Sequence, residues 1–175
     1  MDSLLPQAYL IGLVVILTVA AVAVGRQIWR VRRDEVTLAR LEQQGIKADR
    51  TAVELYELGS AQLRKRLYGQ AADTLKQALK QAQSAGEPGE GLALIENALG
   101  FALAAQNNYK AAIPHYRKAL QAKADYPVAL NNLAFALEKQ FKLDEAREAY
   151  SQALSFDPDN KTARKRLERL ERQAA

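Results

Sequence analysis

The apolar and polar residues of the chain follow two different patterns, which change at about residue 26. No charged residue occurs between Ser3 and Gly25, and the stretch from Ala8 to Gly25 is almost wholly apolar. At a rise of about 1.5 Å per residue, a helix of this length spans about 27 Å, close to the thickness of a bilayer core. The pattern predicts an N-terminal segment over residues 1–25 that contains a transmembrane helix at about residues 8–25.

A cleavable signal peptide is the alternative interpretation of this apolar stretch, and the small residues 21–23 offer a weak cleavage-like site. Signal peptides carry their positive charge before the apolar run, whereas here the arginines follow it, which favours an uncleaved anchor. Because positive flanks stay on the cytoplasmic side, the N-terminus is expected to cross the membrane. The predicted membrane flank, with a tryptophan ring at headgroup level, consists of Arg26, Trp29, Arg30, Arg32 and Arg33.

Residues 26–50 are predicted to form a basic juxtamembrane helix and a short link. The sequence after Arg26 has good helix formers and no breaker until about Gln44, and Gly45 suits the left-handed residue that closes a helix. Thr51 and Glu54 then form a capping-box pattern, which starts a new helix. A soluble domain is therefore expected to begin at residue 51.

From residue 51 onward, small and large apolar residues recur at the spacing of paired helices. Three segments align with one another: LGSAQLRKRLYGQAADTLKQAL, LGFALAAQNNYKAAIPHYRKAL and LAFALEKQFKLDEAREAYSQAL. Equivalent positions lie 34 residues apart from Gly100 to Ala134, and 41 residues apart from Gly59 to Gly100. The surplus of seven residues is assigned to Ser84–Gly91, which has the composition of a loop.

A helix–turn–helix unit of 34 residues with this pattern resembles the tetratricopeptide repeat. The resemblance predicts a solenoid of three repeats, and together with the apolar N-terminal stretch it predicts an all-α fold in which a single transmembrane helix precedes that solenoid. The predicted repeats span about 52–83, 93–126 and 127–160, within a domain at 51–160. Residues 161–175 follow the expected N-cap Asn160 and carry an apolar stripe, which predicts a capping helix. The basic side of that helix is expected to be solvated rather than bound to anionic lipid.

Glu96 and Pro114 are among the residues that depart from the repeat pattern. Glu96 occupies a position where the repeat prefers a large apolar residue, and Pro114 falls within a predicted helix. We expect Pro114 to lie early in that helix, where a missing N–H donor costs less than it would at the centre.

The first helices of tetratricopeptide repeats line a concave groove that binds partners, and fixed repeat positions face it. The resemblance therefore implies a partner-binding surface in which aromatic rings and amides lie among aliphatic and basic side chains. Any one of these residues is more often a solvent-exposed part of the groove wall than an important contact with the partner. As a set, they form the best candidate binding surface. The set comprises Val53, Tyr56, Ser60, Leu63, Arg64, Leu94, Asn97, Phe101, Asn131, Asn132, Phe135 and Lys139.

Repeats that clamp the carboxylate tail of heat-shock chaperones carry lysine, asparagine and arginine at defined groove positions. This chain has Tyr56, Ser60, Ala98, Val128 and Asn132 at those positions. The resemblance does not extend to the clamp, so a co-chaperone role is not expected.

Composition narrows the chemistry further. The chain has no cysteine and a single histidine, His115, which excludes disulfides, thiolate sites and the usual zinc constellations. No sequence pattern links His115 to a carboxylate or a nucleophile, so it is expected to be a surface residue. The glycines of GEPGEG lack the lysine and the strand context of a phosphate-binding loop. We therefore expect no enzymatic activity, metal, cofactor or small-molecule substrate.

The net charge of +5 is concentrated near the ends of the chain. Residues 26–33 carry +4 and residues 161–175 carry +4, whereas residues 34–160 sum to −2. Nucleic-acid binding calls for a basic stripe on the folded body itself, so no nucleic-acid partner is expected.

The arrangement as a whole resembles one family more closely than a generic repeat protein. The resemblance rests on the segments SLLPQAYLIGL, RQIWRVRRDE, YELGSAQL, ENALGFALAAQNNYKAAI, ALNNLAFALEKQ and DPDNKTARKRLERL. Together they resemble the photosystem I assembly tetratricopeptide-repeat protein family of cyanobacteria and plastids. The resemblance implies a non-enzymatic scaffold anchored in the thylakoid membrane, with a lumenal N-terminus and with its repeats on the cytoplasmic (stromal) side. The implied partners are photosystem I subunits, assembly intermediates and other assembly factors, with membrane lipid around the N-terminal helix.

A generic bacterial inner-membrane tetratricopeptide adaptor is the alternative hypothesis. Such a protein would recruit peptide or protein partners to another membrane complex, and photosystem subunits would not co-purify with it.

Overall fold

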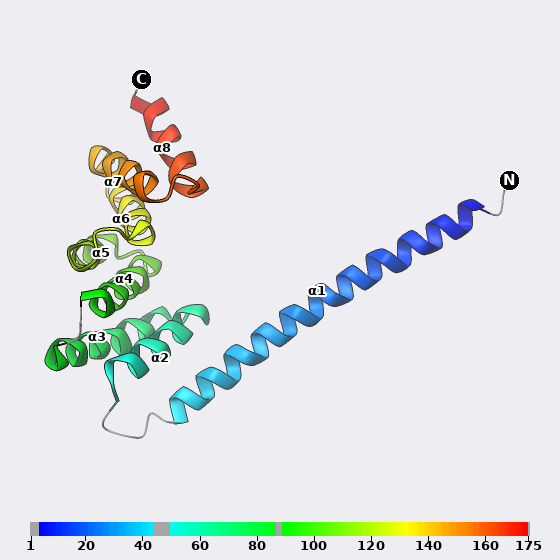
Figure 1. Cartoon of the computed structure of the whole chain (residues 1–175), viewed down its shortest axis with the longest axis horizontal. Helices are drawn as coiled ribbons and strands as arrows, with labels where there is room; N and C mark the ends of the chain where they lie inside the picture. The colour runs from blue at the N-terminus through cyan, green and yellow to red at the C-terminus, as the bar shows by residue number, and fades with distance from the viewer. Residues whose placement is uncertain (1–3, 44–49, 87–88, 175) are drawn as a thin grey trace. The chain divides into compact units, whose positions relative to one another are not determined.

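The computed structural model describes residues 4–43, 50–86 and 89–174, and within these ranges the chain forms α-helices and no strand (Figure 1). It divides into two compact units, Met1–Gln44 and Gly45–Ala175. The first unit holds α1 (Leu4–Gln43). The predicted all-α fold class is confirmed. The second unit holds α2 (Ala52–Arg64), α3 (Tyr68–Ala85), α4 (Gly89–Ala105), α5 (Tyr109–Ala122), α6 (Pro127–Lys139), α7 (Leu143–Phe156) and α8 (Lys161–Ala174).

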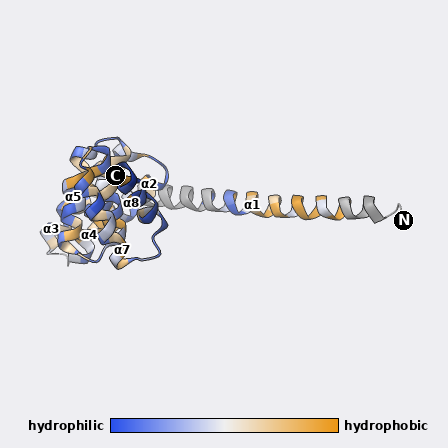
Figure 2. Cartoon of the chain, turned by 90° about the horizontal axis from the view of Figure 1, so that it is seen from above, coloured by the Kyte–Doolittle hydropathy of each residue, from blue (hydrophilic) through white to orange (hydrophobic). Residues whose placement is uncertain are grey.

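α1 is one continuous helix of 40 residues that contains a long apolar segment, coloured orange in Figure 2. The segment Leu10–Trp29 is long and apolar enough to cross a membrane, by length and composition, and none of its 20 residues is buried inside the protein. The Thr18 hydroxyl donates to the Val14 carbonyl at 2.8 Å, so its polar group is satisfied within the helix. The segment overlaps the span predicted at residues 8–25 and reaches Trp29.

The helix continues past the apolar segment through the basic flank to Gln43. The side chains of Trp29 and Arg32 are exposed. The side chains of Arg30 and Arg33 lie outside the described residues, and so do Gly45 and most of the predicted link.

The second unit is a stack of antiparallel helix pairs (Figure 1). α2 packs with α3, α4 with α5 and α6 with α7, and the second helix of each pair packs against the next helix of the chain. The first helices also contact one another, α2 with α4 and α4 with α6, so they share one wall of the stack. Repeated helix–turn–helix units produce this arrangement because each buries its apolar face on its neighbour.

Side-chain caps fix the beginnings of α2 and α8. The Thr51 hydroxyl accepts a hydrogen bond from the Glu54 N–H at 3.3 Å, and the Glu54 carboxylate accepts one from the Thr51 N–H at 3.0 Å. This is the capping box that the sequence predicts. The Asn160 side-chain oxygen accepts from the Ala163 N–H at 3.1 Å, as expected for the N-cap of the last helix.

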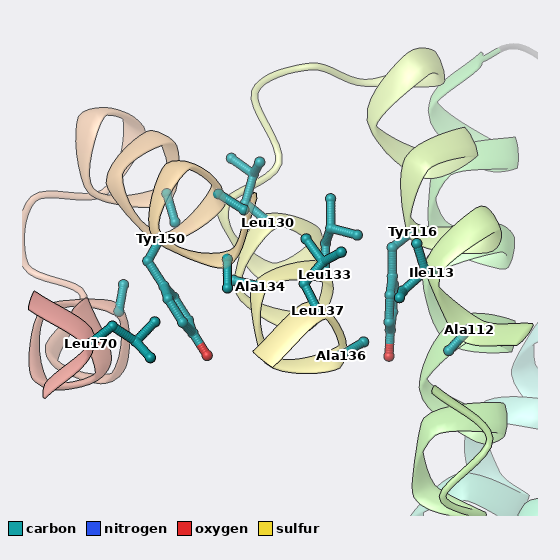
Figure 3. Packing of buried hydrophobic residues seen from close by; sticks show 14 residues of the cluster. Ala112, Ile113, Tyr116, Leu130, Leu133, Ala134, Ala136, Leu137, Tyr150 and Leu170 are labelled. Atoms are coloured by element: carbon teal, nitrogen blue, oxygen red, sulfur yellow. The ribbon is translucent and has the colours of Figure 1, made fainter. Parts of the chain in front are cut away.

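Small residues let the two helices of a pair approach each other until large side chains fill the remaining space. Tyr116 of α5 lies against Gly100 of α4, and a Cβ atom on Gly100 would lie 2.7 Å from Tyr116 Cε1. Gly59 makes the same close approach to Leu75. Tyr116 and Tyr150 are among the largest fully buried side chains, and both belong to the cluster drawn in Figure 3. The small residues are packing residues, as the repeat alignment predicts.

The turn inside each helix pair has the same left-handed backbone conformation. Arg66, Asn107 and Phe141 occupy equivalent positions, with φ of 61°, 63° and 59°. In each turn the following residue donates its N–H to a carbonyl five residues back, at 2.9 to 3.0 Å, as in a Schellman motif. Bulky residues rarely adopt a positive φ. The tight turn therefore imposes a left-handed conformation on Phe141 that its side chain disfavours.

The prediction that Ser84–Gly91 forms a long loop is wrong. α3 has 18 residues and α4 has 17, whereas α5 has 14 and α6 has 13, so the surplus lengthens both helices by about one turn each. Gly86 ends α3 with φ of 66°. Glu90 stands in the first turn of α4, where a negative charge favours the helix N-terminus, and it forms an ion pair with Lys123.

Pro114 lies deeper in its helix than predicted from the sequence. It is the sixth residue of α5, beyond the first turn. Because proline has no N–H, the Lys110 carbonyl lacks the helical hydrogen bond that it would otherwise accept from this position. The position therefore weakens the helix more than a first-turn proline would.

Candidate partner-binding surface

The residues predicted to face the groove lie on α2, α4 and α6, the helices that share one wall of the stack. Val53, Leu94 and Phe101 are exposed apolar residues, and Phe101 is 43% exposed. This wall therefore presents apolar side chains to solvent between polar ones. The remaining predicted residues are the exposed Arg64 and Lys139, the half-buried Tyr56, Ser60, Leu63, Asn131, Asn132 and Phe135, and the buried Asn97.

Two asparagines and a tyrosine form a hydrogen-bonded chain across this wall. Asn97 is only 9% exposed, and its amide group donates to the Tyr126 hydroxyl at 3.2 Å. The Asn97 oxygen accepts from the Asn132 amide group at 3.0 Å. These bonds tie α4 to α6 and engage the groups that Asn97 would offer to a partner. The Asn131 oxygen is buried and has no hydrogen-bond partner among the described residues.

Tyr126 belongs to this wall, although the sequence analysis does not select it. It stands directly before α6, outside the helical positions that the repeat pattern covers. Burial raises the pKa of the Tyr126 phenol, and the nearby Tyr56 raises it further. The hydroxyl therefore stays protonated and neutral at physiological pH.

Phe135 lies in a cluster of one aromatic ring and two cations. The Tyr109 ring meets it edge-on, with centroids 5.9 Å apart and planes at 82°. The Lys139 ammonium lies 5.5 Å from the ring centroid, and the Arg166 guanidinium lies 4.5 Å from it. Both cations are within the range of cation–π attraction. Arg166 comes from α8, so the last helix contributes to the surface built by the repeats.

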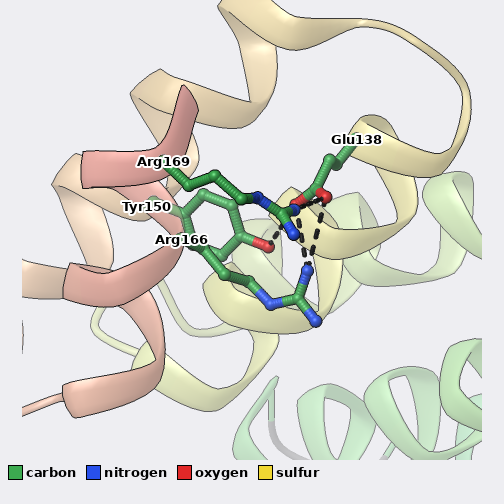
Figure 4. Close-up of polar contacts among 4 residues, drawn as sticks. All are labelled: Glu138, Tyr150, Arg166 and Arg169. Carbon is green, nitrogen blue, oxygen red and sulfur yellow. Dashed lines mark hydrogen bonds and ion pairs between the residues drawn. The ribbon is translucent and has the colours of Figure 1, made fainter. Parts of the chain in front are cut away.

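Glu138 holds two arginines of α8, Arg166 and Arg169, in place (Figure 4). Its carboxylate accepts hydrogen bonds from Arg166 Nη1 at 3.1 and 3.4 Å and from Arg169 Nη2. The Tyr150 hydroxyl also donates to this carboxylate, at 3.3 Å. Burial raises the pKa of the Tyr150 phenol, so Tyr150 acts here as a neutral donor. One carboxylate on α6 therefore orients two guanidinium groups on α8.

The basic residues of α8 line a hollow of about 500 Å³, formed by Lys161, Thr162, Lys165, Arg166, Arg169 and Arg172. The basic side of this helix is expected from the sequence to be a solvated face, and the predicted site residues include none of these side chains. The signal was present in the sequence. If residue 161 is counted as the first of a fourth unit, most of the lining residues occupy the repeat positions that face the groove.

His115 is not an isolated surface histidine, contrary to expectation. Its Nδ1 lies 2.6 Å from a carboxylate oxygen of Glu96, which is 4% exposed. Lys118 lies 4.0 Å from the other oxygen of Glu96. Glu96 occupies a position where the repeat prefers a large apolar residue. Its buried carboxylate is tolerated there because His115 is its hydrogen-bonded partner. Within the described residues, no group of three His, Cys, Asp or Glu side chains could hold a metal ion.

Comparisons with known proteins match this architecture. The tetratricopeptide repeat profile matches residues 49–125 in one form and residues 103–170 in another. The ycf37 protein of Guillardia theta is 35% identical over 170 residues, which is 97% of this chain and 94% of that protein. The chloroplastic tetratricopeptide repeat domain-containing protein PYG7 of Arabidopsis thaliana is 33% identical over 93% of this chain, which corresponds to 53% of its own length.

Solved structures with low sequence identity share the fold. MamA from Desulfovibrio magneticus is 20% identical, with a TM-score of 0.71 over 82% of this chain and 78% of that one. The first tetratricopeptide repeat domain of RPAP3, bound to an HSP90 peptide, is 18% identical, with a TM-score of 0.64 over 71% of this chain and 93% of that one.

Proposed function

Because the chain belongs to the ycf37 family of tetratricopeptide repeat proteins, we propose that it is a membrane-anchored scaffold that assists the assembly or stabilisation of photosystem I at the thylakoid membrane. The observation that carries the proposal is the combination of an apolar helix long enough to span a bilayer with a wall that exposes apolar side chains. A tetratricopeptide repeat stack is a protein-interaction scaffold, and this combination suits partners that lie at a membrane.

The chemistry of the wall supports a polypeptide partner. Val53, Leu94 and Phe101 can take up apolar side chains, because burying them against a partner removes apolar surface from water. Asn97 is bonded within the wall, so we assign it the role of holding α4 and α6 in register.

The thylakoid location is supported by the chloroplastic name of the Arabidopsis relative and by the family resemblance of the sequence. In the proposed topology, Leu10–Trp29 spans the membrane, the basic flank lies on the cytoplasmic or stromal side, and the N-terminus lies in the lumen. An anchor of this kind keeps the groove at the membrane surface and raises its effective concentration near membrane-inserted partners.

The double substitution Leu94→Ala/Phe101→Ala is expected to abolish recovery of photosystem I subunits with the tagged full chain from solubilised thylakoids. Removing two apolar anchors at a binding surface typically costs about 2 kcal/mol or more, which is roughly thirtyfold in affinity. A strain that carries only this variant should accumulate as little photosystem I as a deletion strain. Immunoblots of the purified material and of whole membranes measure both quantities.

Phe156→Ala is the matched control, since Phe156 is 52% exposed on α7, outside this wall. It should leave recovery and accumulation unchanged. Normal photosystem I accumulation in a deletion strain under every light regime would refute the proposed function. Recovery of subunits from another membrane complex in place of photosystem I would support the bacterial adaptor hypothesis instead.

Protease added to the cytoplasmic or stromal face of sealed thylakoids is expected to remove the repeats and to leave a protected fragment containing Leu10–Trp29. The four arginines after the apolar stretch motivate this orientation. Antibodies against an N-terminal tag and against the repeats can follow both parts. Full protection of the repeats until detergent is added would show that the orientation is reversed.

A further inference from the structure

The hollow on α8 adds a strongly basic surface to the apolar and amide-bearing wall. Five of its six lining residues, Lys161, Lys165, Arg166, Arg169 and Arg172, are cationic, and none is acidic. Arg166 also lies over Phe135 of α6, which belongs to the candidate groove. The hollow is therefore continuous with the wall formed by the repeats.

The positive charge of the hollow is only partly neutralised. Glu138 is the one carboxylate within ion-pair distance of these cations among the described residues, and it pairs with Arg166 and Arg169. Lys161, Lys165 and Arg172 have no ion-pair partner in the described part of the chain. One negative charge against five positive ones leaves an excess of four positive charges.

Two of the guanidinium groups are already oriented. Glu138 and the Phe135 ring fix Arg166 from two sides, and Glu138 also holds Arg169. A guanidinium carries five N–H donors, so each arginine keeps donors for a further acceptor. Groups that are held before binding lose less conformational entropy when a ligand arrives.

We propose that this hollow binds the carboxylates of an acidic segment in the protein partner, whose apolar neighbours lie on the α4–α6 wall. The inference rests on the proposed function and adds a chemical requirement for the partner, namely glutamate or aspartate beside apolar residues. Planar guanidinium forks match carboxylates in geometry as well as in charge. Lys161, Lys165 and Arg172 add three further cations, which have no ion-pair partner among the described residues.

Other polyanions fit the surface less well. A nucleic acid would follow a basic track along the folded body, but the body before α8 has a net charge of −2 over residues 34–160. A bilayer presents a flat sheet of headgroups, whereas these residues line a hollow beside exposed apolar side chains. A polypeptide can place carboxylates in the hollow and apolar side chains on the wall at the same time.

The test uses the full chain in a neutral detergent and a fluorescent synthetic peptide of alternating glutamate and leucine, followed by fluorescence anisotropy. We expect saturable binding that weakens as salt is raised. The double substitution Lys165→Glu/Arg172→Glu should weaken binding about tenfold or more, because it replaces attraction by repulsion. A control peptide has glutamine in place of every glutamate. Its affinity for the unchanged protein should be as weak as the affinity of the acidic peptide for the Lys165→Glu/Arg172→Glu variant.

Lys80→Glu/Lys110→Glu is the matched control, since both lysines are exposed on the second helices α3 and α5 and the net charge changes equally. It should bind the acidic peptide like the unchanged protein. Equal binding by the Lys165→Glu/Arg172→Glu variant would overturn the inference, and so would equal binding of the glutamine peptide. Displacement of the peptide by micelles that contain phosphatidylglycerol would overturn it in favour of a lipid ligand.

Failure of this inference can be told apart from failure of the proposed function. If the Lys165→Glu/Arg172→Glu variant still recovers photosystem I subunits while Leu94→Ala/Phe101→Ala does not, the groove function stands and the acidic requirement is refuted. Thermal unfolding followed by circular dichroism checks that both charge variants remain folded. We expect at most a small fall in the melting temperature, because Lys165 and Arg172 make no ion pair in the described part of the chain. Of the two, only Arg172 stands in the last turn of α8, where a cation favours the helix C-terminus.

Discussion

Replacing Tyr150 with alanine is expected to lower the free energy of unfolding of the repeat unit by about 3–5 kcal/mol. The side chain is 0% exposed and lies within the cluster that joins α6, α7 and α8 (Figure 3). Ala134 and Ala146 belong to the same cluster, and residues with such short side chains cannot fill the cavity. The substitution also removes the hydroxyl that donates to Glu138, so the anchoring of Arg166 and Arg169 should loosen.

Urea unfolding of the full chain in neutral detergent, followed by far-ultraviolet circular dichroism, measures this loss. Tyr150→Phe is the control, because it keeps the ring and removes only a hydrogen bond of 3.3 Å, for which we expect about 1 kcal/mol. A Tyr150→Ala protein as stable as Tyr150→Phe would mean that the ring does not hold the last three helices together.

Gly100→Leu is expected to destabilise the same unit by about 3 kcal/mol, at the upper end of the usual effect of overpacking. Even a Cβ atom at this position would lie 2.7 Å from Tyr116 Cε1 and 2.8 Å from Cδ1. The Tyr116 ring is 1% exposed and packs directly on Gly100, so we expect α4 and α5 to separate to make room for a leucine side chain. Separation would expose the packing between the two helices of the second repeat to water.

Gly69→Leu provides the matched comparison, since nothing lies within 4 Å of a Cβ atom at Gly69 of α3. There the exchange removes a flexible residue from a helix and should raise stability by about 0.5–1 kcal/mol. Thermal and urea unfolding of the two variants should therefore shift in opposite directions. A Gly100→Leu protein with unchanged stability would contradict the close approach of α4 and α5.

Local sequence signals predict the architecture well because they depend on residues close together in the chain. The capping box needs only Thr51 and Glu54, and the helix crossing needs a small residue such as Gly100 opposite Tyr116 in the same repeat. The apolar span follows from length and the absence of charge. The helix crossing recurs in each repeat, and the capping box and the apolar span are short, continuous patterns, so the sequence indicates all three.

The candidate surface is less predictable because its decisive contacts join separate elements. Glu96 and His115 read as a misplaced carboxylate and a lone histidine until α4 and α5 bring them to 2.6 Å. Glu138 and Arg169 lie 31 positions apart and meet only when α8 takes its place beside the last repeat. Residue types indicate which groups are polar, but helix packing determines which of them are paired and which remain free.

The lengthened hairpin of α3 and α4 also marks where the chain can accept additional residues. The surplus turns lie at the end of α3 and the beginning of α4, so they extend both helices without rotating the faces on which Leu75 and Leu99 are buried. An insertion at the tight turn of Asn107 would break a closing hydrogen bond and shift the register of the whole array. The Gly86 end of α3 is therefore a permissive site for an epitope or a fluorophore, from which the groove could be observed without being altered.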